Sequence, residues 1–139
     1  MDLKLPPEKE PALYILMRSD LDSLNPGKMV AQGAHAANQF VFEMGRSEKR
    51  DLVRMLDQWQ TSTPQGFGVT LCLDVTGEEL PLVVEAAKRA GFAAGVTHDP
   101  SYPLRDGGVT HSLPLDTCGY VFGNKPDLGI LLGQFDLFK

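Results

Sequence analysis

Four polar side chains that share one side of a predicted helix are suited to binding or catalysis. The row consists of Lys28, Gln32, His35 and Gln39, which stand at i, i+4, i+7 and i+11. This spacing places them on one face of an α-helix. Most other positions of the helix are alanine or glycine, so it can lie close against a sheet while presenting a polar face with a lysine in its first turn. His35 suits either acid–base chemistry or a structural hydrogen bond, and the sequence leaves both interpretations open.

A second group of reactive side chains falls in a turn near residue 107. The sequence RDGGVTH gathers Arg105, Asp106, Thr110 and His111 around a Gly-Gly pair. The backbone freedom of the glycines would let these side chains project together. An ordinary solvated hairpin turn has the same composition, so spacing alone favours neither interpretation.

Metal and nucleophile chemistry have weaker support. His98, Asp99 and His111 are side chains that zinc or iron accepts, but no paired-histidine helix or Cys-x-x-Cys motif accompanies them. Phosphate-loop, dinucleotide and Gly-x-Ser-x-Gly motifs are also missing. We therefore expect neither a metal nor a cofactor. Cys72 and Cys118 lie in apolar runs and are expected to be buried free thiols of a cytoplasmic protein, although neighbouring strands would permit a disulfide.

The elements that must position these groups alternate between strand and helix. The expected strands cover residues 13–18, 67–75, 92–99 and 117–123, and the expected helices cover 28–43, 47–60, 78–91 and 126–135. Ser47 is predicted to cap the second helix, and Thr76 with Glu79 to form a capping box before the third. This order predicts a three-layer α/β/α sandwich around a mixed sheet of roughly four strands. Residues 99–116 are expected to form a long loop, which is typical of a functional or a disordered segment.

Length and charge narrow the class of protein. The chain has 139 residues, which fits a flexible leader at 1–12 followed by a single domain at 13–139. No apolar run is long enough for a membrane span. Acidic residues outnumber basic residues by 18 to 13, for a net charge of −5. That balance excludes a protein that coats nucleic acid through bulk charge, but it permits a local basic patch that acts on one end of an RNA.

The stretch DLDSLNPGKMVAQGAHAA resembles the opening of the archaeal and eukaryotic class of peptidyl-tRNA hydrolases. The residues that fit the family pattern are Asp20, Leu21, Gly27, Lys28, Ala31, Gln32, His35 and Ala36. The turn RDGGVTH is similar to the family's Asp-Ala-Gly-x-Thr-Gln loop at Asp106, Gly108 and Thr110, with His111 in place of the glutamine. Thr117 follows near the family's spacing. Residues 99–104, DPSYPL, look like an insertion before this second motif.

The resemblance implies hydrolysis of the ester between a peptide, or an N-blocked amino acid, and the 3′ end of tRNA. Lys28 would supply positive charge where an oxyanion develops. Asp106 would orient or deprotonate the attacking water, and Thr110 would hold it. His35 completes the expected catalytic set. The residues expected to contact substrate are Asp20, Gln32, Arg105, His111 and Thr117, with Asp20 paired to Lys28 or Arg18.

Contact with the tRNA acceptor end is expected from local cations. These are Lys28, Arg46, Lys49, Arg50, Arg54 and Arg105. The resemblance also allows a homodimer. Two alternatives stay open at this point. One is a non-catalytic RNA- or protein-binding module on the same fold, which the acidic total and the 99–104 insertion favour. The other is a hydrolase of a different small ester or amide.

Overall fold

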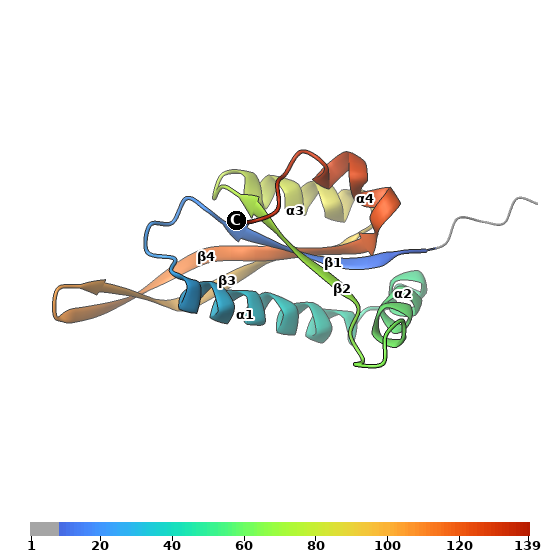
Figure 1. The fold of residues 1–139 in the computed structure, drawn as a ribbon, viewed down its shortest axis with the longest axis horizontal. Helices are drawn as coiled ribbons and strands as arrows, with labels where there is room; N and C mark the ends of the chain where they lie inside the picture. The colour runs from blue at the N-terminus through green and yellow to red at the C-terminus, as the bar shows by residue number, and fades with distance from the viewer. Residues whose placement is uncertain (1–8) are drawn as a thin grey trace, which may run out of the picture.

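The computed structural model describes residues 9–139 and contains the predicted order of strands and helices (Figure 1). The elements are β1 (Pro11–Arg18), α1 (Pro26–Met44), α2 (Arg50–Thr61), β2 (Val69–Val75), α3 (Glu79–Arg89), β3 (Ala93–Asp106), β4 (Val109–Asn124) and α4 (Lys125–Leu132). The predicted leader lies outside the described residues up to residue 8, and its last two residues, Pro11 and Ala12, belong to β1. No helix in the described part is long and apolar enough to cross a membrane.

The four strands form one mixed sheet in the order β2-β1-β4-β3. β1 pairs with β2 in parallel, whereas the β1–β4 and β3–β4 pairs are antiparallel. Helices α1 and α2 cover one face of the sheet, and α3 and α4 cover the other (Figure 1). The predicted three-layer α/β/α sandwich is therefore confirmed.

The core on the α1 side is aromatic at its centre. Phe40 is fully buried, and its ring centroid lies 4.7 Å from that of Phe122 and 5.8 Å from that of Trp59. Earlier in α1, a Cβ added at Gly33 would lie 3.8 Å from the Met17 side chain, an ordinary van der Waals contact. Gly33 and the fully buried Ala36 therefore lie close against the sheet.

One of the two predicted helix caps is confirmed, and Asn25 adds a cap that the sequence did not predict. Asn25 caps α1 by accepting a hydrogen bond from the Lys28 N–H at 2.9 Å. Thr76 and Glu79 form the predicted reciprocal capping box, with bonds of 2.9 and 3.1 Å. The predicted cap at Ser47 is wrong: α2 begins at Arg50, because the preceding backbone is extended and the Ser47 hydroxyl reaches only the Lys49 N–H, at 3.2 Å.

The predicted loop at 99–116 is also wrong, because β3 and β4 continue through it as a hairpin arm, residues 98–117. The arm projects beyond the N-terminal end of α1 (Figure 1). The prolines in this segment make a strand unfavourable in the middle of a sheet. In the structure, β4 pairs with β1 only as far as Cys118. Both strands of the arm are therefore edge strands, which tolerate proline. The arm closes at Gly107, whose φ of 59° suits the first central residue of a type II′ turn.

The two cysteines are free thiols, as predicted. β1 separates β2 from β4, so Cys72 and Cys118 are two strand spacings apart, or roughly 10 Å. That exceeds the Cα separation of about 7 Å that a disulfide can bridge. Burial, followed by the neighbouring Cys118 and Asp74, raises the pKa of the Cys72 thiol to about 11.

Candidate functional site

Three residues of the polar row of α1 contact β3, and the fourth, His35, is exposed. Its contacts with the strand are Gln39 with Thr97 at 2.8 Å, Gln32 with Asp99 at 2.7 Å and Lys28 with the Pro103 carbonyl at 2.6 Å. The helix and the strand run in opposite directions, so successive turns of α1 meet successive residues of β3. The predicted single face is therefore real, and it forms one wall of a site whose other wall is the base of the arm.

Lys28 lies in the first turn of α1 and is half-buried. Its Nζ donates a hydrogen bond to the Pro103 carbonyl oxygen and lies 5.0 Å from the centroid of the Tyr102 ring. A positive charge at this end of a helix adds to the partial positive charge of the helix N-terminus. The ammonium group therefore sits in a locally positive environment, although the chain as a whole is acidic.

Gln32 links the row to two strands. Its side chain is buried, its amide nitrogen donates to Asp99 Oδ2 at 2.7 Å, and its amide oxygen accepts from the Thr117 hydroxyl at 2.6 Å. Thr117 is fully buried. The substrate contacts that the sequence predicted for both residues stay a prediction. In the structure, Gln32 binds the Asp99 carboxylate and Thr117 holds the Gln32 amide.

Asp99 is the carboxylate that the structure brings next to the row. It lines a cavity of about 290 Å³ together with His35, Gln39, Thr97, His98 and Pro100. Burial alone would raise the pKa of Asp99, but hydrogen bonds from the Ser101 N–H and the Gln32 amide, with His35 and His98 nearby, lower it below its usual range. Asp99 is therefore ionised at neutral pH and opens onto the same cavity as the His35 imidazole.

The predicted residues of the second motif lie at the tip of the arm, where all of them are exposed. β-pairing joins Arg105 to Thr110 and Asp106 to Val109. Paired residues point to the same face of a hairpin and successive residues alternate. Asp106 and Thr110 therefore project from opposite faces, and the structure does not bring them together.

The tip is also separated from Lys28. The lysine contacts the arm at Pro103, and Asp106 lies three residues further toward the tip, which is roughly 10 Å along a strand. His111 pairs with Leu104, so it lies well along the arm from His98. Within residues 9–139, no group of three or more His, Cys, Asp or Glu side chains is placed to hold a metal ion.

Asp20 pairs with Arg18, one of its two predicted partners. The guanidinium donates to the carboxylate at 2.9 and 3.2 Å, and the Gly77 N–H donates to it at 3.0 Å. Arg18 also donates to the Asp116 carbonyl at 3.1 Å. The hydrogen bond from Arg18, more than any other contact, lowers the pKa of Asp20. Asp20 thus ties the loop before α1 to the start of α3 and, through Arg18, to the base of the arm.

Replacing Asp20 with asparagine is expected to destabilise the fold only where the carboxylate is ionised. A folded-state pKa below the unfolded value adds stability that is present above about pH 4 and is lost as the pH falls through the folded-state pKa. The carboxylate is partly exposed, so we expect a loss of at most about 1 kcal/mol at pH 7. Urea unfolding of both proteins at pH 7 and pH 3 measures the effect. An equal loss at both values would contradict the assignment to charge.

Two residues of this site were not singled out by the sequence. Asp99 was considered only as a metal ligand, and Tyr102 only as part of an apparent insertion. One sequence feature could have indicated Asp99: it ends the third predicted strand, and a polar side chain at that position can contact the polar face of a neighbouring helix. Tyr102 offered no comparable signal, since its role depends on where the arm folds.

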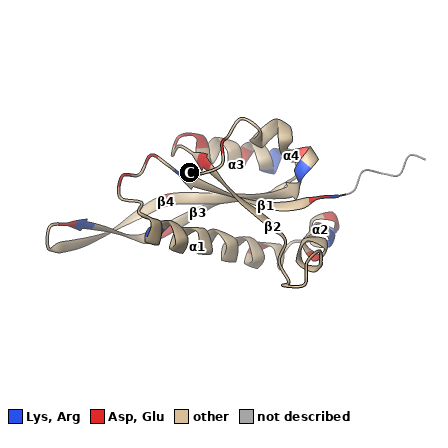
Figure 2. Cartoon of the chain, viewed as in Figure 1, with Lys and Arg blue, Asp and Glu red and all other residues tan. Residues whose placement is uncertain are grey.

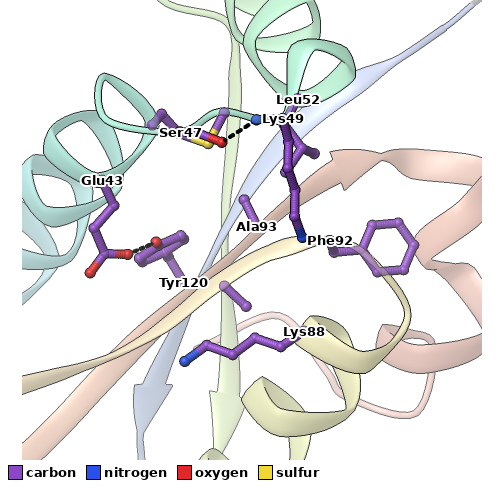
Figure 3. A pocket seen from close by; sticks show the side chains of 10 residues that line it. Glu43, Ser47, Lys49, Leu52, Lys88, Phe92, Ala93 and Tyr120 are labelled. Atoms are coloured by element: carbon purple, nitrogen blue, oxygen red, sulfur yellow. Dashed lines mark hydrogen bonds between the residues drawn. The ribbon is translucent and has the colours of Figure 1, made fainter.

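A second open region lies at the other end of α1. Figure 3 shows Lys49 and Lys88 entering a cavity of about 320 Å³ from two different elements, beside Phe92 and the hydrogen-bonded pair of Tyr120 and Glu43. An adjoining cavity shares Lys49 and Phe92. We call the two together the α2–α3 groove.

Basic side chains gather near this groove. Figure 2 shows Lys and Arg on α2 and at the tip of the arm, whereas most of α1 carries neither charge. Four of the cations predicted to contact RNA lie in α2 or in the few residues directly before it: Arg46, Lys49, Arg50 and Arg54. Lys88, which the sequence did not suggest, joins them from the last turn of α3.

Together, the fold and the site define an α/β protein in which one helix carries a lysine in its first turn and, one turn further along, a glutamine that binds an ionised carboxylate beside an open cavity. The family model for peptidyl-tRNA hydrolase PTH2 matches residues 12–110. That span covers most of the chain and includes the whole polar row, Asp99 and the tip of the arm. This chain belongs to the peptidyl-tRNA hydrolase PTH2 family. A comparison with curated proteins finds no match.

Proposed function

We propose that this protein hydrolyses the ester between a peptide, or an N-blocked amino acid, and the 3′ end of tRNA. The observation that carries the proposal is that the family match spans a polar row in which Lys28 lies one helical turn before Gln32, the residue that binds Asp99. Ester hydrolysis needs positive charge near the developing oxyanion and a group that orients the attacking water. Lys28 and Asp99 supply both.

In the proposed reaction, water attacks the ester carbonyl carbon and the bond to the ribose 3′ oxygen breaks. The Lys28 ammonium stabilises the negative charge that develops on the carbonyl oxygen. Asp99 holds the water, and His35 accepts its proton and returns one to the leaving ribose oxygen. The fixed position of Asp99, bonded to Gln32 and Ser101, keeps the carboxylate in one orientation.

The arm tip takes a different role in this proposal from the one its sequence motif implies. Asp106 and Thr110 project from opposite faces at some distance from Lys28. We assign them, with Arg105 and His111, to contacts with the substrate beyond the ester. Asp99 takes the water-orienting role that the motif would give to Asp106.

We further propose that the α2–α3 groove contacts phosphates of the tRNA away from its 3′ end. Roughly 24 Å of α1 separates Lys28 from Met44 beside the groove. A tRNA whose 3′ end lies at Lys28 can therefore follow α1 and place its phosphates near Lys49, Arg50 and Lys88. Phosphate contacts of this kind set the position of an RNA without reading its sequence.

Replacing both Lys49 and Lys88 with alanine is expected to weaken tRNA binding and its dependence on salt. Each lost phosphate contact should lower the slope of log K against log salt by roughly one unit. Fluorescence anisotropy with labelled tRNA at several salt concentrations measures this slope. Lys139→Ala removes one positive charge at the C-terminus, outside the groove, and should leave it unchanged. An unaltered slope in the double variant would show that the groove does not contact the phosphates of the tRNA.

The central experiment measures release of an N-blocked amino acid from charged tRNA. We expect the wild-type protein to release it catalytically, with free tRNA as the second product. Binding of the tRNA without release would instead support the non-catalytic RNA-binding module. Release from a small ester, with none from the charged tRNA, would support a hydrolase of another substrate.

A further inference from the structure

The base of the arm holds the end of the Lys28 side chain. Tyr102 lies in β3 and is 0% exposed. Its ring centroid is 5.0 Å from the Lys28 Nζ, and the next residue, Pro103, accepts a hydrogen bond from the same Nζ at 2.6 Å. The face of an aromatic ring attracts an ammonium group electrostatically. Two consecutive residues of one strand therefore fix the charged end of this lysine.

Tyr102 is itself fixed from the helix side. Its hydroxyl forms a 3.0 Å hydrogen bond with Ser23, which lies in the loop before α1. Two residues further on, Asn25 caps the helix by accepting from the Lys28 backbone N–H. The loop before α1 thus anchors both the lysine backbone and the tyrosine that contacts the lysine's charged end.

This arrangement limits the directions in which the ammonium can act. A lysine ammonium has three N–H donors on a flexible stem. Pro103 takes one donor, and the Tyr102 ring covers one side of the group. The remaining two donors are available to an oxygen that does not belong to the arm. Restricting a catalytic group to its working position lowers the reaction barrier.

We propose that Tyr102 is a positioning residue for Lys28, so that the arm forms part of the catalytic centre. The inference rests on the proposed hydrolase function. Tyr102 and Pro103 belong to residues 99–104, the segment whose sequence looks like an insertion before the second motif. The segment that looks like an insertion is therefore the one that contacts the proposed catalytic lysine.

The kinetic test compares Tyr102→Leu with Tyr102→Phe. Tyr102→Leu removes the ring face and is expected to lower kcat about tenfold, with KM within about twofold, because the lysine is misplaced in the transition state. Tyr102→Phe keeps the ring face and should retain kcat within about twofold. Leu113→Ala is the matched control, since Leu113 pairs with Tyr102 across the arm and its loss shortens a neighbour without removing the ring.

A spectroscopic measurement tests the position of the lysine directly. Protons next to a ring face shift upfield in NMR, so the Lys28 ε-CH₂ signal should be shifted upfield in the wild-type protein. The shift should persist in Tyr102→Phe and Leu113→Ala and disappear in Tyr102→Leu. Thermal unfolding of each variant shows whether the arm is still folded.

Two results would overturn the proposal. One is a folded Tyr102→Leu protein that has lost the upfield shift and still turns over within twofold of wild type. The other is a wild-type Lys28 signal without the shift. Failure of the proposed function looks different: the wild-type protein would then release no amino acid from charged tRNA, whatever the NMR spectrum shows.

Discussion

Replacing Lys28 with alanine is expected to lower turnover of N-blocked aminoacyl-tRNA about 100-fold or more while the chain stays folded. Removing one donor to a developing oxyanion raises the barrier by roughly 3–4 kcal/mol in other enzymes, and each 1.4 kcal/mol is about tenfold in rate. Lys28 is half-buried, and its ammonium contacts only Tyr102 and Pro103 across the described interface with the arm. The fold should therefore survive its loss.

Single-turnover release from charged tRNA measures this effect, and far-UV circular dichroism monitors the fold. Lys125→Ala is a matched control, because Lys125 also lies at the start of a helix, α4, but on the other face of the sheet. We expect it to retain most of the activity. Near wild-type turnover by a folded Lys28→Ala protein would exclude the lysine from the mechanism.

Replacing Asp99 with asparagine is expected to have a similarly large effect, about 100-fold or more in kcat. Asparagine has nearly the same shape, and its oxygen can still accept a hydrogen bond from Gln32. Its NH2 group cannot accept from the Ser101 N–H, so the negative charge and one acceptor are lost together. Asp106→Asn is the matched control, because it makes the same change on an exposed carboxylate at the arm tip, and we expect a loss of less than about tenfold.

The same pair of variants decides between the structural and the sequence-based assignment. If Asp106→Asn abolishes release and Asp99→Asn does not, the family motif identifies the carboxylate correctly. The arm would then have to bend during the reaction to bring Asp106 to Lys28. Equal losses in both variants would mean that each carboxylate contributes, one at the water and the other through the substrate.

Most of the fold could be predicted because its signals are local. The apolar run from Leu13 to Met17 indicates a buried strand, and the spacing of the row from Lys28 to Gln39 indicates a helix with one polar face. Thr76 and Glu79 form their capping box within four residues of chain. Signals of this kind depend on neighbours in the sequence, so they persist whatever the rest of the chain does.

The arm could not be predicted because its formation depends on distant partners. Proline is unfavourable in the middle of a sheet, and the arm contains Pro100, Pro103 and Pro114. The arm can still form strands because β4 stops pairing with β1 at Cys118, so both strands of the arm have one unpaired edge. The same pairing sets the register, and the register sends Asp106 and Thr110 to opposite faces. Spacing along the chain cannot reveal which face each residue takes.

The sequence by itself determined the order of the elements, the polar row of α1 with Lys28 at its start, and the resemblance that led to the family. The tertiary structure alone decided which residues meet that row: Asp99, held by Gln32 and Ser101, and Tyr102 in the arm. The physical reason is that helix periodicity is encoded over a few residues. The strand opposite a helix is selected by sheet pairing and bulges far along the chain, such as those between Thr97 and Tyr102.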